Sequence, residues 1–137
     1  MRLTDWRQRL MGREGPVECA RTRPFSWKSH NCAAFGGRCV AAVTGENPYA
    51  TYDEACASED DANAILTKMG CTDIEDATAK HFPQISPGEV QAGDLGIIER
   101  RGKKILVVCL GALCAAPGAR GLMFHLRSEL TAAFRVS

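Results

Sequence analysis

The sequence predicts an α+β domain in which N-terminal helices pack on a small C-terminal antiparallel β-sheet. Before Pro87, apolar residues recur at helical spacing and capping residues precede them. After Gly88, short apolar runs alternate with turn residues. Helices followed by strands is the order typical of α+β proteins. With 137 residues, 45% of them hydrophobic and 24% charged, the chain is long enough for one core, and we expect residues 1–137 to form a single domain.

The first helices are indicated by apolar spacing and by their end signals. A short amphipathic helix opens the chain, with its apolar face formed by Leu3, Trp6, Leu10 and Met11. Residues 12–23 contain two glycines, a proline and several charges, so we expect a loop or mobile arm there. The next helix begins at Cys32 and ends at Thr44, with Gly45 as a left-handed cap. Its early glycines, Gly36 and Gly37, predict close approach of another element.

Two further helices follow. Ser58 is a capping residue for a helix that ends at Gly70. The segment Thr72-Asp73-Ile74-Glu75 matches a capping box and starts a shorter helix that ends near His81. Acidic residues in these first turns interact favourably with the positive end of the helix dipole. We expect them to serve as caps and solvated side chains rather than as metal ligands.

The strands of the predicted sheet are short apolar runs with turns between them. They form an antiparallel meander over residues 94–99, 104–111, 112–116 and 121–126, with a closing strand or edge segment at 132–136. The basic cluster Arg100–Lys104 lies between two of these runs. It therefore predicts a solvated hairpin tip, with binding of an anionic partner as the second interpretation.

Composition excludes several classes of function. The net charge is +1 and the pI near 7.6, which gives no basic surface broad enough for nucleic acid. The longest apolar stretch, Ile105–Ala116, is too short to span a bilayer, and the N-terminus lacks a signal-peptide core. We therefore expect a protein that stays where it is made or leaves within a larger assembly. We expect no cofactor.

Seven cysteines, an odd number with no C-x-x-C pair, argue against a disulfide-stapled secreted fold. Most are predicted to be small buried hydrophobes in a reducing cytoplasm. Cys109 and Cys114 are the one closely spaced pair. They leave open a zinc or iron–sulfur site, or a bridge between neighbouring strands.

Cys32 is the main candidate for chemistry, because a thiol at a helix N-terminus is favoured as thiolate by the dipole and by free N–H groups. Acyl transfer also needs an imidazole within hydrogen-bond reach. The candidates are His30, two residues before Cys32, and His125 on a predicted strand. His81, at a helix end, is expected to be structural.

The residues around Cys32, together with Gly93–Ile98, resemble the NlpC-type cysteine peptidases of the papain-like superfamily. In that family an Asp-Cys-Ser-Gly-Phe-like segment starts the catalytic helix. A Gly-Asp-Leu strand opens the sheet, and the next strand begins with the catalytic histidine. The layout is more closely similar to a family of short bacteriophage proteins of unknown function, encoded among tail genes. The matching segments are Phe25-Ser26-Trp27, Cys32-Ala33, Gly93-Asp94, Val107–Gly111, Gly121-Leu122 and Phe134-Arg135.

This chain departs from the peptidase pattern at three places. Asn31 replaces the Asp before the cysteine, Ala33-Ala34 replaces Ser-Gly, and Lys104 or Ile105 stands where the strand histidine belongs. Loss of the base lowers acyl-transfer rates by about 10²–10⁴. The resemblance therefore implies a catalytically degenerate scaffold that assembles with other tail or baseplate proteins in the virion, after synthesis in the host cytoplasm.

The alternative is a cysteine peptidase or amidase acting on peptidoglycan peptides. Cys32 would then be its nucleophile, with His125 or His30 as an unusual base. A metal- or cluster-binding module built on Cys109 and Cys114 is the third hypothesis.

Overall fold

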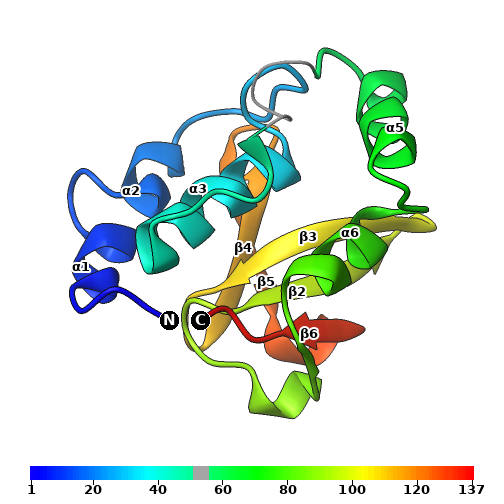
Figure 1. Ribbon diagram of the computed structural model, residues 1–137. Helices are drawn as coiled ribbons and strands as arrows, with labels where there is room; N and C mark the ends of the chain where they lie inside the picture. Colours follow the sequence, from blue (N-terminus) through cyan, green and yellow to red (C-terminus); the bar gives the residue numbers. More distant parts are fainter. Residues whose placement is uncertain (51–55) are drawn as a thin grey trace.

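The computed structural model describes residues 1–50 and 56–137 and confirms the α+β class (Figure 1). Its helices are α1 (Trp6–Met11), α2 (Pro16–Ala20), α3 (Cys32–Thr44), α5 (Glu59–Lys68) and α6 (Ile74–His81). Its strands are β1 (Gln84–Ile85), β2 (Leu95–Arg100), β3 (Lys103–Cys109), β4 (Leu113–Gly118), β5 (Gly121–Leu126) and β6 (Ala132–Phe134). All strands join one antiparallel sheet in the order β1-β6-β2-β3-β4-β5. The short 3-10 turns are η1 (Pro87–Glu89) and η2 (Arg127–Glu129).

The sheet has a core on each face, because successive residues of a strand point to opposite sides. On β3, Leu106 and Val108 belong to the larger core, which the sheet shares with the helices. Val107 and Cys109 belong to a smaller core on the other face. This smaller core consists of Val90, Ile98, Val107, Cys109, Cys114, Ala116, Leu130 and Ala133.

Helix α3 lies directly against the sheet, as its glycines predict. A Cβ atom on Gly36 would stand 2.6 Å from Cδ2 of Leu106, so any larger residue would force Leu106 or the helix to shift. The helix ends as predicted at Gly45, whose φ of +92° is the left-handed conformation that glycine adopts readily. The close contact fixes the start of α3, and with it Cys32, over the sheet.

The two ends of the described chain meet at Asp94, just before β2. The Asp94 side chain is fully buried; it forms an ion pair with Arg2 at 2.8 Å and accepts the backbone N–H of Val136 at 3.0 Å. Arg2 also donates through Nε to the Val136 carbonyl at 2.8 Å. Figure 1 shows the N- and C-termini side by side at this point. The Gly93-Asp94 motif therefore joins the first residues of the chain, the sheet and the last residues.

The structure corrects two predictions about the helical half. Residues 16–20, expected to be part of a loop, form α2: Pro16 occupies the first turn, where its missing N–H costs nothing, and Val17 and Ala20 are buried. The cap of α6 is Asp73 rather than Thr72, and its side chain accepts the N–H of Asp76 at 2.8 Å.

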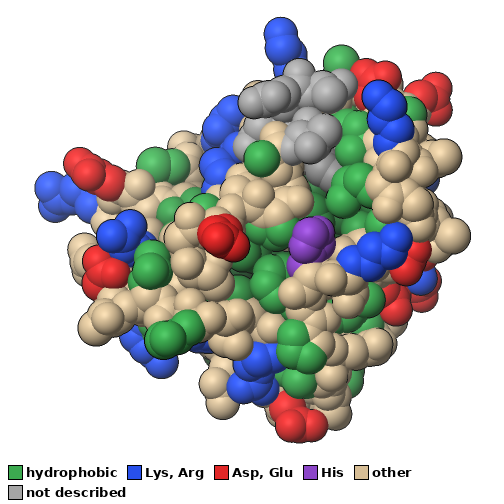
Figure 2. Space-filling model, viewed as in Figure 1, with side chains coloured by type: hydrophobic (Ala, Val, Ile, Leu, Met, Phe, Trp, Pro, Cys, Tyr) green, Lys and Arg blue, Asp and Glu red, His purple; other side chains and the backbone are tan. Residues whose placement is uncertain are grey.

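The sheet also differs from the predicted meander. β1 was not expected, and β6, predicted as a closing strand or edge segment, lies between β1 and β2. Residues 100–103 form the predicted hairpin turn, with Arg101 and Gly102 at positive φ. Across the face drawn in Figure 2, Lys and Arg side chains are interspersed with Asp and Glu. Within residues 1–50 and 56–137, no helix has the length and apolar character needed to cross a membrane.

Candidate functional site

Cys32 is the first residue of α3, and its position is set by the cap before it. The Asn31 side chain accepts the N–H of Ala34 at 2.8 Å and donates to the Trp27 carbonyl at 2.9 Å. These two bonds tie the loop to the first turn of the helix. Asn31 thus caps the helix in the place where the peptidase pattern has Asp, so this departure leaves the local geometry intact.

Cys32 lines a cavity of about 710 Å³ between the start of α3, α5, the start of α6 and the β2–β3 hairpin. Trp27 and Phe25 form part of its apolar wall. Its polar wall comes from residues on opposite sides of the opening, Glu59 and Asp73 facing Lys103 and Lys104. The cavity is large enough for a peptide side chain or a small ligand.

The surroundings of Cys32 disfavour its thiolate form. Burial raises the pKa of Cys32, while hydrogen bonds with the backbone of Leu106 and Ala33 act in the opposite direction and are outweighed. The backbone N–H groups at the helix start do lower the pKa of Cys32, as expected, but burial acts more strongly in the opposite direction. Cys32 is half-buried by the packing of α3 on β3, and loss of hydration disfavours the charged thiolate at this position.

Lys104 is one of the two residues, with Ile105, expected at the position of the strand histidine in the peptidase pattern. It lies near the start of β3 and lines the same cavity as Cys32. Its Nζ forms ion pairs with Asp73 at 3.0 Å and with Glu75 at 3.2 Å. Hydrogen bonds to these two carboxylates raise the pKa of Lys104. The side chain therefore remains an ammonium and has no lone pair with which to accept a proton from the thiol.

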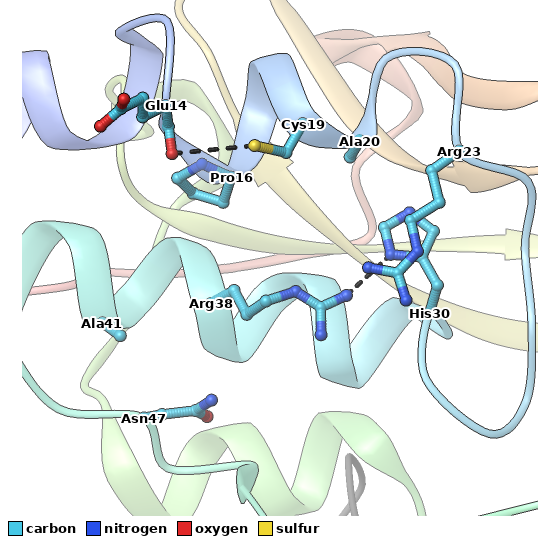
Figure 3. A pocket seen from close by; sticks show the side chains of 9 residues that line it. All are labelled: Glu14, Pro16, Cys19, Ala20, Arg23, His30, Arg38, Ala41 and Asn47. Carbon is cyan, nitrogen blue, oxygen red and sulfur yellow. Dashed lines mark hydrogen bonds between the residues drawn. The ribbon is translucent and has the colours of Figure 1, made fainter.

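His30 is buried in a different cavity, of about 320 Å³, between α2 and α3. Figure 3 shows Arg38 extending to the His30 ring, with Cys19 and Ala20 of α2 on another side. Arg38 donates to Nδ1 of His30 at 2.7 Å, so the neutral ring carries its proton on Nε2. Burial and the charges of Arg38 and Arg23 lower the pKa of His30 to about 4. His30 is thus a neutral acceptor for Arg38 and does not line the Cys32 cavity.

His125 lies on the sheet face opposite to Cys32. It is on β5 directly opposite Cys114, and paired residues share a face; Cys114 belongs to the smaller core. Its Nδ1 lies 3.2 Å from Arg100, and burial is the main cause that lowers the pKa of His125. The sheet therefore separates His125 from the cysteine.

The structure thus brings neither candidate base to Cys32. The residues that line the Cys32 cavity, all within the described chain, include no histidine. His81, expected to be structural, lies at the end of α6 with its ring centroid 6.1 Å from that of Tyr49. The described residues contain no cluster of three or more His, Cys, Asp or Glu side chains able to hold a metal ion.

The sequence did not reveal the ion-pair and hydrogen-bond partners that determine the chemistry of Lys104 and His30. Asp73 and Glu75 were interpreted only as capping residues, yet both bind Lys104. Arg38 carried no signal, because its contact with His30 depends on how the loop before α3 folds back. The opposite charges of 73–75 and 103–104 were the one available hint, and charge alone does not specify a pairing between distant segments.

Comparison with known proteins gives one match. The model of a family described as a domain of unknown function, DUF6950, matches residues 1–136. Curated proteins and solved structures gave no match. Because the match covers nearly all of the chain, this protein belongs to the DUF6950 family.

Proposed function

We propose that the protein is a structural component of a bacteriophage tail tip or baseplate, built on an NlpC-like scaffold that has lost hydrolase chemistry. The proposal starts from the resemblance in the sequence, and the α+β fold with Cys32 at the start of α3 agrees with it. The observation that carries it is the ion-paired Lys104 in the Cys32 cavity.

Lys104 argues against hydrolysis in two ways. A thiol nucleophile needs a base that accepts its proton, and an ammonium with two carboxylate partners cannot do so. The same ion pairs join β3 to the start of α6, and the pair between Lys103 and Glu59, at 2.7 Å, joins the hairpin to α5. Ion pairs that hold the two sides of the cavity together suit a structural protein better than a hydrolase, whose cleft must admit a peptide.

An exposed apolar patch on β4 and β5 supports a role in assembly. Leu113 and Leu126 are directly opposite one another, and Phe124 lies two residues along β5 on the same face. Their exposed fractions are 39%, 59% and 53%. Exposed apolar side chains of this size that lie next to one another are found more often at protein–protein contact sites than on surface that stays in contact with solvent. A neighbouring tail subunit is the partner that the proposal implies.

Alkylation of the folded protein tests the loss of hydrolase chemistry. We expect iodoacetamide to modify Cys32 at least about ten-fold more slowly than the exposed Cys19, because the reaction proceeds through the thiolate. Peptide mass mapping over time gives both rates. In urea the two rates should converge, which controls for intrinsic differences. Rapid, selective labelling of Cys32 in the native protein would contradict the proposal and favour the cysteine hydrolase.

Complementation of a phage that lacks the gene tests the assembly role. Cys32→Ala should restore tail assembly and plaque formation, whereas the double variant F124E/L126E should abolish incorporation into virions. Met123→Glu is the matched control, since Met123 is equally exposed but lies on the other face of β5. Circular dichroism verifies that each variant is folded. The proposal fails if the protein is absent from purified virions, or if folded Cys32→Ala does not complement.

A further inference from the structure

Cys109 and Cys114 lie directly opposite one another at the ends of β3 and β4 that face their connecting turn. Both backbone groups of Cys109 are engaged with the other neighbour: its N–H donates to the Asp94 carbonyl at 2.8 Å, and its carbonyl accepts from Gly93 at 2.8 Å. The pair with Cys114 is therefore of the non-hydrogen-bonded kind, in which the side chains of antiparallel strands come closest.

This register fits a disulfide without movement of the strands. Non-hydrogen-bonded pairs have Cα atoms about 4.5 Å apart, and disulfides occur at Cα separations from about 4.4 Å upward. Both cysteines are free, and both side chains point into the smaller core of the sheet. His125 lies next to Cys114 in the same row across the strands.

The surroundings distinguish the two sulfurs. A hydrogen bond with the Cys114 thiol is the main cause that lowers the pKa of Cys109, and the charge of Arg127 acts in the same direction. The same hydrogen bond raises the pKa of Cys114. Arg127 is anchored over this corner through a hydrogen bond from its guanidinium to the Gly111 carbonyl at 3.4 Å. The shared hydrogen bond thus favours a thiolate on Cys109, and we assign the first attack to this sulfur.

We propose that Cys109 and Cys114 are a redox modification site that closes to an intrachain disulfide by exchange with a low-molecular-weight disulfide. The Cys109 thiolate attacks one sulfur of the oxidant and releases its other half as a thiolate. Cys114 then loses its proton and attacks the Cys109 sulfur of the mixed disulfide, and the second half leaves. The protein gives up two protons and two electrons, and one oxidant disulfide becomes two thiols.

Access to the pair is through the β3–β4 turn. Both cysteine side chains are fully buried, but the turn beside them contains exposed Ala112 and Gly111 at φ +117°, with open space around it. Opening this turn exposes both sulfurs without separating the rest of the sheet. Oxidation should therefore be slower than modification of exposed Cys19, and it does not depend on the role proposed for Cys32.

The test uses the full chain with Cys19→Ser, which removes the exposed thiol. After incubation of the native protein with oxidised glutathione, iodoacetamide blocks the remaining thiols. Trypsin releases residues 105–120 as one peptide, in which Cys109 and Cys114 are the only cysteines. We expect this peptide to be lighter by two hydrogen atoms and unalkylated, and to accept two alkyl groups after reduction. The oxidised protein should also melt at a higher temperature.

The variant Cys114→Ser, in the same background, controls for the second step. It should stop at the mixed disulfide, with glutathione on Cys109. The proposal is overturned if residues 105–120 remain doubly alkylated after oxidation of the native protein, or if the bridge forms only in urea. Loss of the same two hydrogen atoms from this peptide in Cys114→Ser would also overturn it, since no partner sulfur is then present.

Discussion

Replacing Asp94 with alanine should lower the free energy of unfolding by about 3–5 kcal/mol, the cost of removing one partner of a buried ion pair. The change leaves Arg2, whose side chain is only 16% exposed, without its carboxylate. It also leaves the N–H groups of Gln91 and Val136 without their acceptor. Urea denaturation followed by circular dichroism measures the loss.

Asp5→Ala is the matched control for this experiment. Asp5 also forms an ion pair with an arginine, Arg9 at 2.9 Å, but both side chains are more than half exposed. Exposed pairs of this kind contribute about 0–1 kcal/mol. If Asp94→Ala lowers the free energy of unfolding no more than Asp5→Ala does, the contacts of Asp94 with the two chain ends are not what stabilises the fold.

Replacing Gly36 with valine should lower the free energy of unfolding by about 1–3 kcal/mol, because it overpacks a filled core. It should also disturb the packing of α3 on the sheet. The new Cβ would meet Cδ2 of Leu106 at 2.6 Å, and Leu106 is itself buried. Because the same helix start carries Cys32, its alkylation rate should rise as the packing loosens. Thermal denaturation and mass mapping provide the two readouts.

Two further variants separate overpacking from helix propensity. Ala41→Val introduces the same β-branched side chain on the same helix but toward a cavity, and it should change stability little. In a Leu106→Ala background, the space opposite Gly36 is enlarged, so Gly36→Val should cost less there. An equal cost in both backgrounds would show that contact with Leu106 is not the reason for the glycine.

Local signals predicted the elements whose ends are set by their own residues. Gly45 ends α3 and Ser58 begins α5 because a left-handed glycine and a capping hydroxyl act within one turn of the chain. The same signals failed where burial outweighs them. Gly15 and Pro16 indicated a loop, but Val17 and Ala20 find partners in the core and hold α2 in place.

The site was predictable only in part, because its chemistry depends on contacts between distant segments. The position of Cys32 at a helix start follows from Asn31 and the small residues after it. Its protonation state does not, since it depends on how closely β3 approaches. Likewise, periodicity placed His125 on a strand, but which face it occupies follows from pairing with Cys114. The relation to phage tail proteins remains a prediction.

The hydrogen bond between Arg2 and Val136 has a consequence for how the protein folds during its synthesis. These residues are 134 positions apart, so the contact cannot form until Val136 has left the ribosome. The helices emerge first, with apolar faces whose partner strands, β2, β3 and β6, do not yet exist. Contacts of such wide sequence separation slow folding and leave intermediates open to aggregation. We therefore expect the nascent helical half to depend on chaperones until β6 and Val136 have emerged, and the native fold to form only then.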